Sequence, residues 1–137
     1  PMEPQNAIVH VKKEGNDVVG CEVWASTQVP TWLREDLPKY LKIRDEALKI
    51  DVPFVGGGFG RRLFHDFIME AAYLSREVDA PVKVVWTRED DTLHGPFRPG
   101  TYSVLKGGLD KAGKPVAFQH KVVAPSIDAV MFGNVME

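Results

Sequence analysis

The segment from Val55 to Arg62 reads Val-Gly-Gly-Gly-Phe-Gly-Arg-Arg, with four glycines in five successive positions. Glycine has no side chain and adopts positive φ without strain, so such a cluster is favoured where backbone must approach another group closely. An apolar run precedes the glycines and an amphipathic helical pattern follows them, and the free N–H groups at a helix start attract anions. We therefore expect this loop to bind a ligand; the alternative is a flexible turn that only lets a strand pack against a helix.

The two standard nucleotide-binding loops do not fit this spacing. A dinucleotide-binding G-x-G-x-x-G pattern that starts at Gly56 needs a glycine where Arg61 stands. A P-loop needs Lys and then Ser or Thr after its last glycine, whereas Arg61, Arg62 and Leu63 follow Gly60. Both kinds of loop are excluded.

Other side chains of types that can act in catalysis or binding lack the neighbours that a site needs. Adjacent His65 and Asp66 resemble a base and its orienting group, but neighbours on a helix point in different directions. We interpret Arg88–Asp91 as a solvated turn and Cys21 as strand packing. Gln28 lies in a polar loop after a buried strand, where its amide is able to bind a ligand oxygen, with a plain turn residue as the default. The histidines show no ligand spacing: His10, His65, His94 and His120.

Composition excludes several classes of function. The 137 residues carry 17 basic and 19 acidic side chains, for a net charge of -2, which gives no electrostatic case for binding nucleic acid. The single cysteine excludes an internal disulfide and a cysteine-ligated metal cluster held by this chain alone. No apolar run approaches the length of about 18 residues that would predict a membrane span. The length favours a single domain over residues 1–137, which we interpret as a fragment of a larger subunit.

The hydrophobic pattern predicts an α+β fold: a two-layer sandwich in which a mixed β-sheet is covered by two helices. Hairpins at both ends and strand-helix units between them support this assignment over a purely parallel sheet. We expect Pro38 to fray or kink the first helix. The expected elements are strands Ala7–Lys12 and Val18–Ala25, a helix from Pro30 to Leu41, a strand Leu48–Val55, a helix ending near Pro81, a strand Val82–Trp86, a polar connection Thr87–Gly100, and strands Tyr102–Leu109 and Val116–Val123.

Four segments in this order resemble one protein family. They read Pro-Met-Glu-Pro from Pro1, Val-Trp-Ala-Ser-Thr-Gln up to Gln28, Gly-Gly-Gly-Phe-Gly from Gly56, and Pro-Val-Lys-Val-Val-Trp-Thr-Arg-Glu-Asp from Pro81. Together they resemble the molybdenum-cofactor-binding part of the xanthine oxidase and aldehyde oxidase family. The form Gly-Gly-Gly-Phe-Gly-Arg-Arg is similar especially to the large, or beta, subunit of the isoquinoline 1-oxidoreductase type.

The resemblance implies a molybdenum hydroxylase that oxidises an N-heteroaromatic compound or an aldehyde, with water as the source of oxygen. It implies a molybdenum-pterin cofactor, in the cytosine dinucleotide form, and iron-sulfur clusters on a small partner subunit. In the family, the glutamine of the Ser-Thr-Gln motif hydrogen-bonds a molybdenum oxygen, and the glycine-phenylalanine loop lies against metal and pterin. The corresponding residues here are Gln28, Gly57, Gly58, Phe59 and Gly60.

Three departures from the family pattern qualify this expectation. Leu63 stands where purine-hydroxylating members carry a glutamate, so a purine substrate is not expected. Arg61 and Arg62 replace a glycine-lysine pair. The family's catalytic glutamate lies beyond the matched segments, so we expect no catalytic residue in this chain and no activity from it alone. The competing hypothesis is a stand-alone binding or assembly module that uses the loop for an anionic ligand or a partner strand.

Overall fold

The computed structural model describes residues 1–133 of the chain, which divides into two compact units, Pro1–Gly95 and Pro96–Glu137. The second hairpin forms a two-stranded sheet of its own, separate from the four-stranded sheet of the first unit. Within the described residues, no helix has the length and apolar character needed to cross a membrane.

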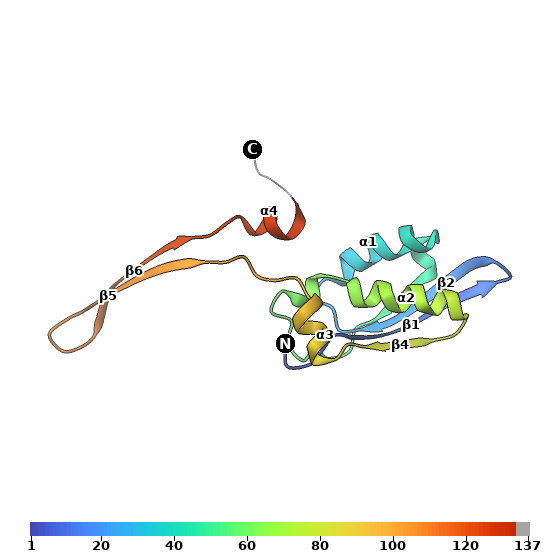
Figure 1. The fold of residues 1–137 in the computed structure, drawn as a ribbon, viewed down its shortest axis with the longest axis horizontal. Helices are drawn as coiled ribbons and strands as arrows, with labels where there is room; N and C mark the ends of the chain where they lie inside the picture. The colour runs from blue at the N-terminus through green and yellow to red at the C-terminus, as the bar shows by residue number, and fades with distance from the viewer. Residues whose placement is uncertain (134–137) are drawn as a thin grey trace. The chain divides into compact units, whose positions relative to one another are not determined.

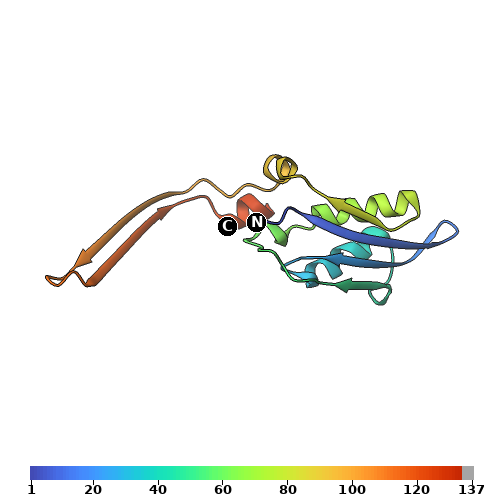
Figure 2. The ribbon, with the colours of Figure 1, turned by 90° about the horizontal axis from the view of Figure 1, so that it is seen from below.

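The first unit is built on a mixed four-stranded sheet with the strand order β3-β2-β1-β4 (Figure 1). Strand β1 (Asn6–Glu14) pairs antiparallel with both β2 (Asp17–Ala25) and β4 (Val82–Val85). Strand β3 (Leu48–Asp51) is parallel to β2 and follows a short 3-10 turn, η1 (Asp45–Ala47). Helices α1 (Pro30–Leu41) and α2 (Asp66–Val78) lie on the same side of this sheet (Figure 1; Figure 2). The predicted α+β class, mixed sheet and two covering helices are confirmed.

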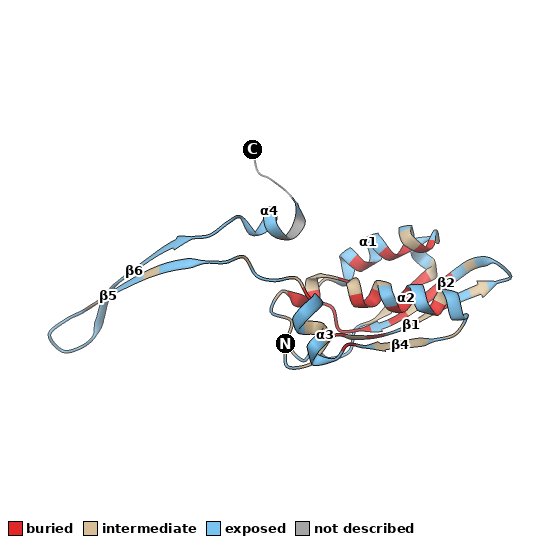
Figure 3. Cartoon of the chain, viewed as in Figure 1, coloured by how far each residue is buried: buried red, intermediate tan, exposed pale blue. Residues whose placement is uncertain are grey.

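The core lies between the sheet and the two helices, whose buried residues face it (Figure 3). Alternate residues of β1 are buried, as expected for a strand with one covered face. The buried positions of the helices recur at helical spacing, and Pro38 is tolerated inside α1 with its ring buried. Trp32 of α1 and Val78 of α2, by contrast, are 42% and 59% exposed. The buried helix residues include Leu33, Leu37 and Leu41 of α1 and Phe67, Ile68, Ala71 and Ala72 of α2.

Two predicted segments differ from the structure. Strand β3 ends at Asp51 instead of Val55, because Pro53 has no N–H to donate to a ladder and the following residues are exposed. The connection predicted to be irregular contains helix α3 (Arg88–His94), which Thr87 begins with a reciprocal capping box. The second unit holds strands β5 (Tyr102–Leu109) and β6 (Pro115–Val123), as expected, and a short helix α4 (Ile127–Phe132).

A buried contact joins the start of α2 to the loop that follows β2. His65 directly precedes α2, is 8% exposed, and places its Nε2 3.0 Å from Oγ1 of Thr27. This hydroxyl donates to the carbonyl oxygen of Arg62 at 3.2 Å and accepts the N–H of Val29 at 3.1 Å. Because the single hydroxyl proton is used on Arg62, we assign the proton of the imidazole to Nε2, which donates to Thr27.

We predict that acid destabilises the fold through His65. Burial lowers the pKa of this ring below 6.5, against the opposing effect of the carboxylates of Asp36 and Asp66. The unfolded chain therefore takes up a proton first, and the free energy of unfolding falls as the pH drops below about 6.5, by at most about 1.4 kcal/mol per pH unit. Urea unfolding at about pH 7.5 and about pH 5.5 can be followed by tryptophan fluorescence. The free energy of unfolding should fall less between the two pH values in His65→Gln than in the unsubstituted chain.

The exposed His94 supplies the matched control. The variant His94→Gln should keep the full loss of stability between the two pH values. If the free energy of unfolding falls equally between the two pH values in both variants and in the unsubstituted chain, His65 does not control the pH dependence.

Candidate functional site

The glycine loop, residues 56–60, lies between β3 and a 3-10 turn, η2 (Arg61–Leu63). Helix α2 begins only at Asp66, so η2 and two further residues separate the loop from the helix. The expectation that a helix start provides the N–H groups is therefore wrong. The backbone donors available here therefore belong to the loop itself.

The loop has an unusual backbone that leaves two N–H groups unpaired. Gly57, Phe59 and Gly60 have φ values of +91°, +51° and +83°. Turns that include left-handed residues gather successive N–H groups into an anion-binding concavity. The N–H of Gly56 donates to Glu3 and that of Gly60 to Gln28, whereas the N–H groups of Gly57 and Gly58 have no acceptor among the described residues.

The side chain of Gln28 is oriented by this loop. Its Oε1 accepts the N–H of Gly60 at 2.9 Å, and its own backbone N–H donates to the carbonyl oxygen of Arg62 at 3.0 Å. Because a backbone N–H can only donate, the bond to Gly60 fixes which end of the amide is oxygen and leaves Nε2 as a donor. A Cβ at Gly58 would overlap the Gln28 side chain. Glycine at this position is therefore needed for Gln28 to lie against the loop.

Phe59 is the non-glycine residue of the loop that takes a left-handed conformation, and it is 77% exposed. Its ring lies over Gly57, where an added Cβ would come within 2.6 Å of Cε2. Left-handed backbone costs an ordinary residue about 1–2 kcal/mol. The structure thus brings together all the residues that the sequence predicts to bind the cofactor, and Phe59 among them has strained backbone: Gln28, Gly57, Gly58, Phe59 and Gly60.

The two arginines after the loop point inward and bind protein groups. Arg62 is fully buried. Its Nε donates to the carbonyl oxygen of Gly57 at 3.1 Å and its Nη1 to that of Ser26 at 3.0 Å. Its Nη2 donates to the carbonyl oxygen of Glu3 at 3.2 Å and to the Glu3 carboxylate at 3.0 Å. One guanidinium therefore joins the N-terminal segment, the residues after β2 and the glycine loop.

Arg61 binds on another side of the same turn. It makes a bidentate pair with Asp66, at 2.9 and 2.8 Å, and its Nε lies 3.3 Å from Oδ1 of Asp91. Its guanidinium also lies over the ring of Trp86, 5.1 Å from the centroid. Asp91 belongs to α3 and only 5% of its side chain is exposed. The interpretation of Arg88–Asp91 as a solvated turn is wrong, because this run forms a helix that supplies a counter-charge to Arg61.

The other candidates stay apart from the loop; His65 contacts Thr27, the residue before Gln28. The described residues contain no group of three side chains able to hold a metal ion. Cys21 is buried in the core, and burial raises the pKa of its thiol to about 12, as expected for a packing residue. Asp66 pairs with Arg61, so it does not orient His65.

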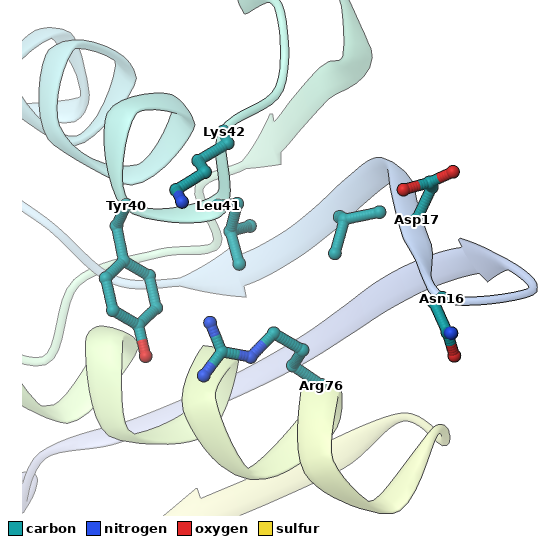
Figure 4. Close-up of a pocket in the computed structure, with 7 residues that line it drawn as sticks. Asn16, Asp17, Tyr40, Leu41, Lys42 and Arg76 are labelled. Carbon is teal, nitrogen blue, oxygen red and sulfur yellow. The ribbon is translucent and has the colours of Figure 1, made fainter.

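A surface cavity of about 310 Å³ lies between the β1–β2 turn and the C-terminal ends of α1 and α2 (Figure 4). Arg76, one of its lining residues, stacks on Tyr40 and Tyr73 at 5.4 and 5.5 Å from the ring centroids and pairs with Glu77 at 3.1 Å. No residue of the glycine loop lines this cavity. It is therefore distinct from the site described above.

The sequence analysis missed the contact between Glu3 and Arg62. Both residues lie in or beside the segments that carried the family resemblance, but 59 positions separate them. The available signal was two adjacent arginines directly after a glycine loop. That signal does not reveal which way either side chain points.

Comparison with known proteins identifies the family. Residues 1–126 match the molybdopterin cofactor-binding domain. The chain is 37% identical over 133 residues to the isoquinoline 1-oxidoreductase subunit beta of Brevundimonas diminuta, covering 96% of this chain and 16% of that protein. It is 39% identical over 100 residues to the aldehyde oxidoreductase molybdenum-binding subunit of Escherichia coli K12, covering 72% of this chain and 14% of that protein.

A solved structure supports the same fold. Quinoline 2-oxidoreductase from Pseudomonas putida 86 matches 89% of this chain and 15% of its own, with a TM-score of 0.63 at 23% identity. The chain thus spans about a sixth of the length of the relatives it matches. The family resemblance found in the sequence is confirmed. Because the family profile covers residues 1–126, the chain belongs to the molybdopterin cofactor-binding domain family.

Proposed function

We propose that this chain forms part of the molybdenum-pterin site in the large subunit of a molybdenum hydroxylase. The observation that carries the proposal is a set of three donors with no acceptor among residues 1–133: Nε2 of Gln28 and the N–H groups of Gly57 and Gly58. The proposed substrate is an N-heteroaromatic compound or an aldehyde, oxidised with water as the source of oxygen. The names of the isoquinoline 1-oxidoreductase and aldehyde oxidoreductase relatives support these two substrate classes.

The residues present fit such a cofactor on two grounds. All three donors are neutral, so they can bind oxygen or sulfur atoms of partial negative charge without adding a net charge to the site. Gly57 and Gly58 also leave no Cβ between the backbone and a ligand, which permits close approach. When bound, the cofactor supplies the two-electron oxidation of the substrate.

In this proposal the residues of the chain bind and orient, and none of them transfers a proton. Gly60 holds the amide of Gln28 so that its Nε2 protons face the ligand. The ring of Phe59 lies over Gly57 and covers one side of the loop backbone. We propose that the catalytic glutamate lies in a part of the large subunit beyond these residues.

The substrate proposal also draws on Leu63. This half-buried side chain, in η2, stands where purine-hydroxylating relatives carry a glutamate. An apolar side chain offers no hydrogen bond to a purine, and leaving polar groups of a substrate unpaired costs binding free energy. An apolar N-heteroaromatic compound or an aldehyde suits this position better.

Further parts of the proposal concern the whole assembly. We propose the cytosine dinucleotide form of the cofactor and iron-sulfur clusters on a small partner subunit. The rest of the large subunit would complete the cofactor contacts, since one loop and one glutamine are too few to hold a ligand of this size. Residues 1–137 alone are therefore expected to be inactive. A stand-alone binding module is not favoured, because the matched relatives are named as subunits of oxidoreductases.

The first test is a double-mutant cycle on Gln28 and Gly58 in the complete enzyme. Gln28→Ala should reduce kcat by about 10- to 1000-fold, the range for loss of a single oxyanion donor. Gly58→Ala should also reduce kcat, because its Cβ displaces the Gln28 side chain. In a background of Gln28→Ala, Gly58→Ala should lower kcat by less than about a further threefold, because the space that the Gln28 side chain occupied is then vacant.

Gly107 supplies the control for this cycle, because a Cβ there meets no atom within 4 Å. Gly107→Ala should leave kcat unchanged. Fully additive effects of Gln28→Ala and Gly58→Ala would mean that the two residues act independently. Unchanged kinetics in Gln28→Ala would remove this side chain from the cofactor site.

The second test separates stability from cofactor binding at Phe59. Phe59→Gly should leave the free energy of unfolding unchanged or raise it by up to about 1 kcal/mol, because glycine relieves the left-handed strain. In the complete enzyme the same change should lower the molybdenum content per polypeptide, measured by mass spectrometry of the metal. The two results together would show that the strained backbone of Phe59 serves cofactor binding and not the stability of the fold.

Phe54 is the matched control, since it is fully exposed and does not have a positive φ. Phe54→Gly should lower the free energy of unfolding by about 0.4–1 kcal/mol through the added freedom of the unfolded chain, with the molybdenum content intact. A Phe59→Gly enzyme that is destabilised yet fully loaded would contradict the role proposed for this residue.

A further inference from the structure

Arg62 contacts both parts of the proposed donor set. Its guanidinium holds the carbonyl oxygens of Gly57 and Ser26, while its own carbonyl oxygen accepts the backbone N–H of Gln28 at 3.0 Å. The loop and Gln28 are therefore attached to the same residue, the first through its side chain and the second through its backbone. A shift of Arg62 would change the position of Gln28 relative to the loop.

Glu3 supplies the counter-charge of this buried arginine and also contacts the loop. Its Oε2 lies 3.0 Å from Nη2 of Arg62 and accepts the N–H of Gly56 at 3.1 Å. A Cβ at Gly56 would come within 2.6 Å of this same oxygen, so the approach requires glycine. A hydrogen bond from Asn6 lowers the pKa of Glu3 most, against the opposing effect of burial, and the hydrogen bond from Gly56 and the charge of Arg62 lower it further.

We propose that Glu3 and Arg62 are a positioning pair, which fixes Gln28 and the glycine loop in the geometry that binds the cofactor. The inference rests on the proposed function for the identity of the ligand. Arg62 has no exposed surface, so it cannot touch a ligand and acts through the groups it holds. The pair sets where the donors lie, and Gln28 and the loop do the binding.

Arg61 provides a matched comparison. It is also buried and also ion-paired, but its side chain binds Asp66 and Asp91 instead of the loop. Arg61→Lys should therefore destabilise the fold without loosening the donor set. Arg62→Lys keeps the charge but replaces a planar fork by a single ammonium, which cannot serve acceptors on three segments at once. Glu3→Gln removes only the charge, at a partly exposed side chain, and is the milder variant.

The test is hydrogen-deuterium exchange on the intact, cofactor-free large subunit with its partner subunit. In Arg62→Lys, the amides of Gln28, Gly56 and Gly60 should exchange roughly tenfold faster or more than in Arg61→Lys, because their acceptors move. In Glu3→Gln the amide of Gly56 should show the largest change. The amides of Gly57 and Gly58, which have no acceptor in the described structure, should not change.

The molybdenum content of the loaded enzyme is the second measurement. It should fall further in Arg62→Lys and Glu3→Gln than in Arg61→Lys at equal thermal stability. Exchange at these amides no faster than in Arg61→Lys would overturn the positioning pair. Full molybdenum content and turnover in Gln28→Ala would instead overturn the proposed function, and the exchange result would stand because it is measured without cofactor.

Discussion

The organisation of the site depends on one buried guanidinium. Moving a charged group out of water costs several kcal/mol unless it is paired and hydrogen-bonded. Arg62 meets this condition only because Glu3, Ser26 and Gly57 converge on it from three segments of the chain. Removal of Glu3 would leave the buried charge without its ion-pair partner, and removal of Ser26 or Gly57 would leave guanidinium N–H groups without an acceptor. The requirement to satisfy Arg62 therefore fixes the loop, the N-terminal segment and the residues after β2 relative to one another.

The glycine loop retains its strained backbone because both ends are held. Gly56 is bound through its N–H to Glu3, and Gly60 is bound through its N–H to Gln28. Between these points the chain passes through left-handed conformations. Phe59 is held in a strained conformation that it would leave if the loop were free. The N–H groups of Gly57 and Gly58, in the middle, have no acceptor within the part of the chain that the structure describes. The loop thus has fixed ends and open donors, an arrangement suited to binding an oxygen-rich ligand.

Much of the first unit follows from sequence pattern alone. The β1–β2 hairpin and the two covering helices have strong periodic signals, and the cluster of four glycines marks the site without any knowledge of the fold. The directions of Arg61 and Arg62 could not be predicted, because both depend on acids brought near by folding. Asp91 illustrates the same limit. The composition of Arg88–Asp91 is typical of a solvated turn, and only the fold shows that Asp91 pairs with Arg61.

The second hairpin shows a different limit. Its strands are correctly predicted, but strand pattern does not state which sheet a hairpin joins, and β5 and β6 pair with each other alone. Nearly every residue of the pair is exposed, including Phe118 and Leu105. Two strands without a covering layer are marginally stable in water. The local pattern therefore predicts the elements, whereas the assembly of the hairpin depends on contacts outside it.

We propose that Gln28 and the middle of the glycine loop face the cofactor, and a crystal structure of the complete, cofactor-loaded enzyme would show whether they do. Nε2 of Gln28 and the N–H groups of Gly57 and Gly58 should then lie within about 3.2 Å of cofactor atoms, the range of a hydrogen bond. A loaded enzyme in which these three donors contact only water or protein would rule out the proposed site.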